Sequence, residues 1–225
     1  MKGIKLVIFD FDGTIGDTKD LIIKAMFNAK DRWNWTLPSV RECEEIIGLP
    51  LKEGFRKIFP GLTEEQLECR CSEYRTYFID NCMDLVPSAF PHVEETLSEL
   101  KSRGIRLTIA SSRHKTSLTQ YLNGMKLLDF FEYIVGPEDV AKGKPSPDPV
   151  LKTLETLGLG PGESVVMGDT SYDILMGVRA GAYTCGVSYG VGTVEQLEEA
   201  GAGYVVNDFA DILSVIAEIE KNQQA

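Results

Sequence analysis

Long apolar segments are missing from this chain of 225 residues, and no run approaches the roughly 18 residues that a membrane-spanning helix needs. Residues 1–10 contain an apolar run that is too short for a signal peptide and that ends in an acidic stretch. The sequence therefore predicts a protein without a membrane partner.

Cysteine is sparse and lacks the spacing of a disulfide framework or a zinc site. There are five cysteines, an odd number, and the only close pair is Cys69 and Cys71. Reduced thiols are typical of cytoplasmic proteins. We therefore expect a cytoplasmic location.

Positive charge is also in short supply. Lysine and arginine total 23 against 34 acidic residues, and the formal net charge is −11. This balance argues against nucleic acid and anionic membranes as partners. An anionic ligand would have to be attracted locally, by a metal, a lysine or backbone N–H groups.

The hydrophobic content of 43% is ordinary for a globular protein, and the length fits one domain with a large insertion. An apolar strand pattern at 6–9 is followed by helical patterns up to residue 83, with no strand signal. The expected helices of this insert cover 18–33, a short stretch after Ser39, 51–59 and a stretch after Thr63, the two hydroxyl residues each opening a capping box.

From residue 91 onward, helix and strand patterns alternate. Helices are expected at 93–101, 115–122, 147–157, 172–180, 194–200 and up to about 221, and strands at 105–110, 133–135, 164–167, 183–187 and 204–206. Alternation of this kind predicts an α/β fold, with a Rossmann-like parallel sheet covered on both faces. The predicted division is a core domain, residues 1–15 and 84–225, and a small inserted α-helical cap domain, residues 16–83, that folds over the strand ends.

Two carboxylates follow the first predicted strand. Asp10 and Asp12 are separated by one residue, so strand alternation would place them on the same side, and Gly13 and Thr14 come next. Two like charges this close are costly unless a cation or a proton separates them. The spacing predicts that the pair shares a metal or that one member is protonated.

Polar residues end two further strands. Ser111 and Ser112 follow a strand and precede a helix, where hydroxyl and N–H groups bind phosphate; the alternative is that one of them is simply a helix N-cap. Asp169 ends another strand and Asp173 follows one helical turn later, a carboxylate set that suits Mg²⁺; the alternative is a cap and a surface residue. Between these strands, Lys144 lies in a proline-stiffened loop, where it would neutralise phosphate charge or be a solvated surface lysine.

These four segments together resemble the four motifs of the haloacid dehalogenase-like (HAD) hydrolases. The matching residues are Asp10-Phe11-Asp12-Gly13-Thr14, Ser111, Lys144-Pro145 and Gly168-Asp169 with Asp173. The resemblance spans nearly the whole chain, the helical insert is similar to a C1-type cap, and the branch most alike is that of the phosphoglycolate phosphatases.

The resemblance implies a Mg²⁺-dependent phosphatase that acts on a small phosphorylated metabolite, such as a phosphoglycolate-like compound or a sugar phosphate. Asp10 would be the nucleophile and form an aspartyl-phosphate, and Asp12 would be the general acid and then the base. Mg²⁺ would be held by Asp10, Asp169 and the backbone carbonyl of Asp12, with Asp173 orienting its waters. Lys144 would offset the charge of the reacting groups.

Phosphate binding is expected from Ser111, Ser112, Lys144 and the N–H groups near Gly13. The second motif departs from the Thr-Asn-Lys that is frequent in the family, because Arg113 and His114 follow the serines. Either residue would reach a second anionic group of a substrate or simply lie on the surface.

Alternative functions stay open at this point. A β-phosphoglucomutase-like enzyme would use the same aspartate pair, and a non-catalytic module would only bind a phosphorylated ligand. A monomer is expected. The cap aromatics Trp33, Trp35, Phe55 and Tyr74 would line the site or, more in keeping with their helical spacing, form the cap's own core.

Overall fold

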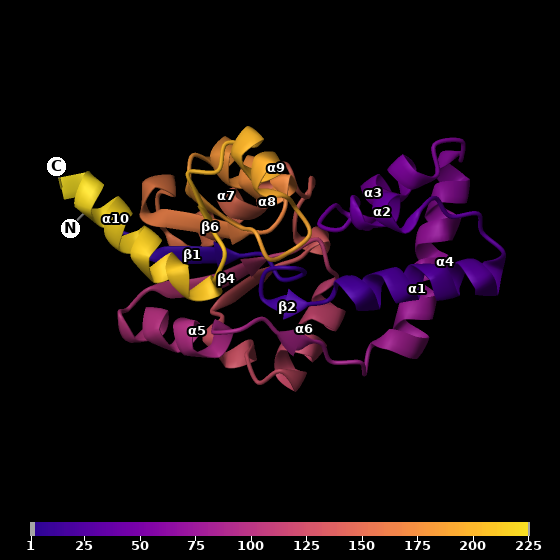
Figure 1. Ribbon diagram of the computed structural model, residues 1–225, viewed down its shortest axis with the longest axis horizontal. Coiled ribbons are helices and arrows are strands. Elements are labelled where there is room, and N and C mark those ends of the chain that lie inside the picture. Colours follow the sequence, from indigo (N-terminus) through magenta and orange to yellow (C-terminus); the bar gives the residue numbers. More distant parts are fainter. Residues whose placement is uncertain (1–2, 225) are drawn as a thin grey trace.

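The computed structural model describes residues 3–224 and has a central sheet of six parallel strands, in the order β5-β4-β1-β6-β7-β8 (Figure 1). The strands are β1 (Leu6–Phe9), β4 (Arg106–Ala110), β5 (Tyr133–Val135), β6 (Ser164–Gly168), β7 (Tyr183–Val187) and β8 (Tyr204–Val206). The predicted α/β fold with a Rossmann-like sheet is confirmed.

Helices cover both faces of this sheet. They are α5 (Val93–Ser102), α6 (Lys115–Gly124), α7 (Asp148–Leu157), α8 (Ser171–Ala180), α9 (Val194–Glu199) and α10 (Ile212–Gln224), with short 3₁₀ segments at Leu128–Phe130, Pro137–Asp139, Pro161–Glu163 and Phe209–Asp211. All the helices and strands expected after residue 91 are present, with bounds that differ by a few residues at most.

Strand β1 shows why two helical layers are needed. All four of its residues are buried, and successive side chains point to opposite faces. Leu6 and Ile8 pack in a cluster that includes Val150 of α7 and Met176 of α8, whereas Val7 and Phe9 join the larger core on the other face. Because both faces of the strand are apolar, each requires its own helical cover.

A group of four helices lies beyond the end of the sheet, at the right of Figure 1. They are α1 (Lys19–Trp33), α2 (Val40–Glu44), α3 (Leu51–Ile58) and α4 (Glu64–Cys82). The two predicted capping boxes are present, at Ser39 before α2 and at Thr63 before α4. We call this group the helical unit.

Aromatic side chains form the interior of the helical unit. Trp35 and Phe55 are buried and contact each other edge to face, with ring centroids 5.9 Å apart. Phe55 contacts Tyr74 in the same way, at 5.5 Å. The core interpretation is confirmed for Trp35 and Phe55, and Trp33 packs against that core while half-buried. Tyr74 fits both interpretations, core and site, because it is buried and also lines a pocket.

A two-stranded antiparallel ribbon joins the sheet to the helical unit, and the sequence patterns did not predict it. It pairs β2 (Gly16–Asp17) with β3 (Ser88–Ala89). The expectation of no strand signal before residue 83 was wrong here, because a two-residue strand carries no side-chain periodicity and its pairing partner is remote in sequence. The ribbon lies where the chain leaves the sheet and where it returns.

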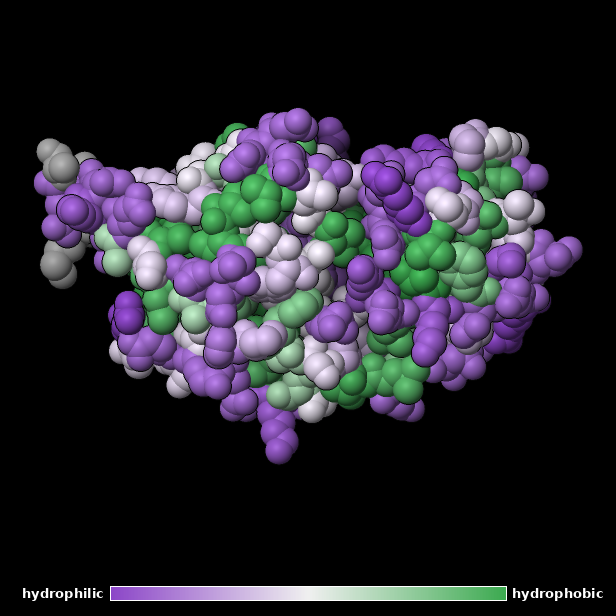
Figure 2. Space-filling model, viewed as in Figure 1, coloured by the Kyte–Doolittle hydropathy of each residue, from purple (hydrophilic) through white to green (hydrophobic). Residues whose placement is uncertain are grey.

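The surface on the face shown in Figure 2 is largely hydrophilic, with hydrophobic side chains gathered in separate patches over both the sheet and the helical unit. Among the helices of residues 3–224, none is long and apolar enough to span a bilayer.

Candidate active site

The predicted site residues come together because β1 lies between β4 and β6 in parallel register. Phe9 is paired with Ile109 on one side and with Met167 on the other. The residue after Phe9 is therefore level with the ends of both neighbouring strands, and the Asp10 N–H donates to the Met167 carbonyl over 2.9 Å. Asp10, Ser111 and Asp169 thus emerge at one edge of the sheet, where ligands bind in open α/β folds.

Asp10 is buried and paired with Lys144. The Lys144 ammonium donates to Asp10 Oδ1 in a short ion pair, while Asp10 Oδ2 is buried and accepts no hydrogen bond. Lys144 is 2% exposed, so the interpretation of this residue as a surface lysine was wrong. One oxygen of the carboxylate is held by a cation and the other is left without a partner.

Three carboxylates lie around this lysine. Oxygens of Asp10, Asp169 and Asp173 lie within 4.8 Å of one another, and all three residues are buried. The Lys144 ammonium is also 2.5 Å from Asp173 Oδ1. One ammonium facing three carboxylates leaves two negative charges, which is the charge that a divalent cation offsets.

Burial raises the pKa of Asp10 well above its usual range. Lys144 opposes that shift, and the charges of the neighbouring aspartates add to it. Burial likewise raises the pKa of Asp169 to about 7, although hydrogen bonds to that carboxylate act in the opposite direction. The cluster therefore holds its negative charge at a cost, because desolvation disfavours the charged form.

The Asp169 carboxylate is fixed by its neighbours. Thr14 Oγ1 donates to Oδ1 over 3.2 Å, and the Val191 N–H donates to Oδ2 over 2.8 Å. Gly13 has a φ of +89°, and a Cβ at this position would lie 2.2 Å from Asp169 Oδ2. A side chain at Gly13 would collide with the carboxylate, so glycine is required there.

Asp173 lies in the first turn of α8 and is fully buried, so the interpretation of it as a surface residue was wrong. Its Oδ2 accepts hydrogen bonds from the Thr170 hydroxyl and N–H, over 2.6 and 3.1 Å, and forms a capping box. Its other oxygen faces Lys144. Asp173 was predicted to lie behind the metal ligands, whereas its carboxylate belongs to the same cluster as those of Asp10 and Asp169.

Asp12 has a different cation from Asp10. The Arg113 guanidinium binds both carboxylate oxygens, with Nε 3.1 and 3.0 Å from Oδ1 and Oδ2 and Nη2 2.6 Å from Oδ1. The two side chains are 11% and 7% exposed. The sequence spacing predicted a shared metal or a proton for Asp10 and Asp12, and a separate cation for each carboxylate was not predicted.

Arg113 is held between two aromatic rings. Its guanidinium carbon lies 5.1 Å from the ring centroid of Phe78 in α4 and 4.9 Å from that of Tyr121 in α6. Cation–π contacts of this kind stabilise a desolvated guanidinium. A surface role for Arg113 is excluded by this geometry, whereas the His114 side chain is 62% exposed and lies 3.6 Å from Glu138.

The two serines at the end of β4 point to different partners. Ser111 is buried, and its Oγ accepts a hydrogen bond from the Arg113 N–H over 3.1 Å. Ser112 Oγ donates to the carbonyl of Gly48, in the helical unit, over 2.7 Å. Neither serine is the N-cap of α6, because that position belongs to His114. Ser112 therefore joins the sheet edge to the helical unit.

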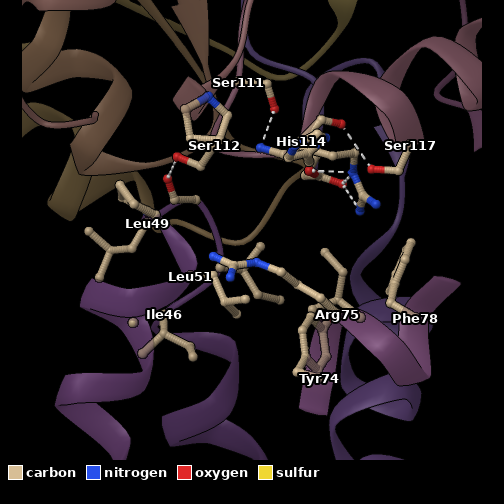
Figure 3. Close-up of a pocket in the computed structure, with 18 of the residues that line it drawn as sticks. Ile46, Leu49, Leu51, Tyr74, Arg75, Phe78, Ser111, Ser112, His114 and Ser117 are labelled. Carbon is tan, nitrogen blue, oxygen red and sulfur yellow. Dashed lines mark hydrogen bonds and ion pairs between the residues drawn. The ribbon is translucent and has the colours of Figure 1, made fainter. Parts of the chain in front are cut away.

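The site opens into a pocket of about 410 Å³ between the sheet edge and the helical unit. Asp10, Asp12, Ser111 and Ser112 lie at its sheet side, and side chains of the helical unit form the opposite wall. Figure 3 shows Ile46, Leu49 and Leu51 facing the serines across the pocket.

Comparisons with known proteins agree with this geometry. The family model described as "Haloacid dehalogenase-like hydrolase" matches residues 7–187. Pyrophosphatase PpaX of Bacillus pumilus is 32% identical over 213 residues, covering 95% of this chain and 96% of that protein. A protein of Dickeya dadantii named "Probable phosphatase IndB" is 31% identical over 210 residues, covering 92% and 91%.

A solved structure described as a predicted phosphatase from Clostridium acetobutylicum superposes with a TM-score of 0.87 at 28% identity and covers 96% of this chain and 99% of its own. A haloacid dehalogenase-like hydrolase structure from Bacteroides fragilis also gives 0.87, at 27% identity, covering 93% and 99%. With the family model matching most of the chain, the protein belongs to the haloacid dehalogenase-like hydrolases and is an enzyme of the phosphatase type.

Proposed function

We propose that the protein is a Mg²⁺-dependent phosphatase that hydrolyses a small phosphorylated metabolite through an aspartyl-phosphate. The observation that carries this proposal is the buried Asp10 carboxylate, which has one oxygen on Lys144 and the other without a partner beside the pocket. A carboxylate oriented in this way can attack phosphorus, and the reaction divides into formation and hydrolysis of the acyl phosphate.

Asp12 is the proposed general acid for the leaving alcohol and then the base for the attacking water. It lines the same pocket as Asp10 and is two residues away, so it can reach the leaving oxygen while Asp10 attacks. Arg113 keeps the Asp12 side chain in place at the pocket wall. Lys144 offsets part of the charge that builds up when a carboxylate meets a phosphate.

The phosphoryl oxygens would be held by Ser111, by Lys144 and by backbone N–H groups near Gly13. Ser111 Oγ accepts one hydrogen bond, which leaves its own proton free to donate to a phosphoryl oxygen. Ser112 shares in phosphate binding only if its hydroxyl leaves the Gly48 carbonyl, which it contacts here.

The residues present fit a Mg²⁺ ion. The donor set consists of carboxylate oxygens, which hard divalent cations prefer, and the excess negative charge matches such an ion. Asp10, Asp169 and the carbonyl of Asp12 would hold Mg²⁺, and Asp173 would orient its waters or bind directly. When bound, the ion would supply charge stabilisation to the phosphoryl group.

The proposed organisation is a catalytic core of residues 1–15 and 84–225 and a cap of residues 16–83, with residues 1–2 and 225 outside the described structure. The β2–β3 ribbon lies beside these borders. We also propose a monomer in the cytoplasm without nucleic acid or membrane partners. The charge of −11 and five free cysteines support that environment.

The test is hydrolysis of p-nitrophenyl phosphate by the full chain with Mg²⁺, with EDTA in place of Mg²⁺, and by Asp10→Asn. We expect release of nitrophenol only with Mg²⁺ and only with Asp10 intact. Thermal unfolding verifies that the variant is folded. Equal rates in wild-type protein and Asp10→Asn would refute the role of Asp10 as the nucleophile. Activity that depends on an added bisphosphate sugar would favour the mutase instead.

Inorganic pyrophosphate is a second candidate substrate. Several relatives, including the one from Bacillus pumilus, are named pyrophosphatase PpaX. The phosphoryl site described above would accept either a phosphate ester or a phosphoanhydride. Measuring kcat/KM for pyrophosphate and for p-nitrophenyl phosphate under the same conditions separates the two.

A further inference from the structure

The pocket wall opposite the phosphoryl site is mostly apolar. At the sheet edge the lining is polar, with Asp10, Asp12 and Ser111. The helical unit contributes mainly aliphatic and aromatic side chains, together with three charged ones, Lys52, Glu53 and Arg75. Six of its apolar side chains are those of Met26, Ile46, Leu49, Leu51, Phe78 and Ile79, and we call this group the apolar wall. Figure 3 shows four of these side chains around the cavity.

Ile79 indicates that the apolar wall is not only the interior of the helical unit. Its side chain is 63% exposed and lies on α4, at the pocket. A large apolar side chain at a cavity mouth stays in contact with water in the folded protein, so it adds little hydrophobic stabilisation to the fold. It gains only when a ligand or another surface covers it.

The helical unit brings two cations to the pocket lining, Lys52 and Arg75. Lys52 lies 3.3 Å from carboxylate oxygens of both Glu64 and Glu68, so its charge is directed away from the pocket. On the sheet side, Arg113 is bound to Asp12. A second anionic group on the substrate would meet one cation there, Arg75, whose guanidinium reaches into the cavity in Figure 3. Elsewhere the wall offers such a group mainly aliphatic and aromatic side chains, against which a charge is unfavourable.

We propose that the substrate is a phosphate monoester whose alcohol carries an apolar body, an alkyl or aryl group of several carbons, that packs on the apolar wall. This inference rests on the proposed phosphatase function and narrows its substrate class. The cavity of about 410 Å³ lies within the range of small-molecule sites, about 300–1,000 Å³. It is far larger than a phosphoryl group requires.

The experiment is a chain-length series of n-alkyl phosphates from ethyl to hexyl, compared with 2-phosphoglycolate and inorganic pyrophosphate, all with Mg²⁺. Each buried methylene should raise kcat/KM by up to about fourfold, mainly through KM. A flat series, or a preference for pyrophosphate or phosphoglycolate over hexyl phosphate, would overturn the inference and leave the phosphatase function intact.

Variants locate the effect. Ile79→Lys should raise KM for hexyl phosphate about tenfold and leave that for ethyl phosphate within twofold. Val178→Lys is the matched control, because Val178 is 45% exposed on α8 and lies outside the pocket lining. Its replacement should change the KM for neither hexyl nor ethyl phosphate. An equal change in KM for hexyl and ethyl phosphate in Ile79→Lys would refute a role for the apolar wall.

A binding measurement separates this inference from the proposed function. The affinity of n-alkylphosphonates for Asp10→Asn, measured by calorimetry, should rise with chain length even though that variant does not turn over. Affinity independent of chain length would refute the apolar subsite. If wild-type protein hydrolyses no ester but the affinity still rises, the phosphatase proposal fails and the subsite stands only as a binding site.

Discussion

Replacement of Arg113 by methionine tests how the proposed acid–base residue is held. Methionine keeps an unbranched apolar side chain between the rings of Phe78 and Tyr121 but removes the charge and the donors. Asp12, 11% exposed, would then be left without the cation that binds both of its oxygens. Breaking a buried ion pair on one side typically costs about 3–5 kcal/mol.

For Arg113→Met we expect a loss of unfolding free energy at the lower end of this range, about 3 kcal/mol. The reason is that Asp12 lines the pocket and can recover some hydration. For a chain of this length that corresponds to a fall in Tm of about 6–12 °C. The kcat for p-nitrophenyl phosphate should fall as well, since the Asp12 carboxylate loses its fixed orientation. Arg113→Lys should be intermediate, because an ammonium cannot form the two-pronged contact.

The assay is a double-mutant cycle followed by thermal and urea unfolding, with Asp12→Asn as the second change. If Arg113 and Asp12 stabilise each other, the double variant should lose less unfolding free energy than the two single variants lose together. The difference should exceed about 1 kcal/mol. A Tm for Arg113→Met within about 2 °C of wild type, or additive effects, would refute this reasoning.

Three further predictions concern the carboxylate site. Mg²⁺ at a hundredfold excess over its Kd should raise Tm by about 5–10 °C, from about 2.7 kcal/mol of linkage, and Asp169→Asn should abolish the shift; the same Tm with and without Mg²⁺ in wild type would contradict the metal site. Asp12→Ala should lower kcat about 10²–10⁴-fold while the protein stays folded, and turnover within tenfold of wild type would remove Asp12 from acid–base catalysis. Gly13→Ala should destabilise by more than about 1 kcal/mol, because its φ is positive and its Cβ would collide with Asp169, whereas Gly162→Ala, at an open position, should be nearly neutral by urea unfolding.

The sheet and its polar edge were predictable from sequence because both depend on local patterns. Short apolar strands ending in Asp10, Ser111 and Asp169 sufficed to predict a parallel sheet with a common polar edge. Parallel strands end at the same edge whatever their order in the sheet, so the meeting of these residues did not require the topology to be known. The capping boxes before α2 and α4 are local for the same reason.

The contacts that the sequence did not reveal are those between segments far apart in the chain. Arg113 was interpreted as a possible surface residue, but its direction depends on Phe78 and Tyr121, which come from different parts of the fold. The Val191 N–H that binds Asp169 lies in a loop without a motif. No pattern of spacing in one segment specifies such contacts, because they depend on how the helical unit sits against the sheet.

The side chains proposed for catalysis and those proposed for substrate selectivity come from different parts of the fold. The groups that would handle the phosphoryl group, such as Asp10, Ser111 and Lys144, are fixed by the sheet edge and its loops, where register and burial leave little freedom. The groups that would meet the rest of the substrate, such as Leu51 and Ile79, come from the helical unit. Substitutions in the sheet edge should therefore change kcat for all phosphate esters alike, whereas those on the apolar wall should change the ranking of esters and leave the reaction itself in place.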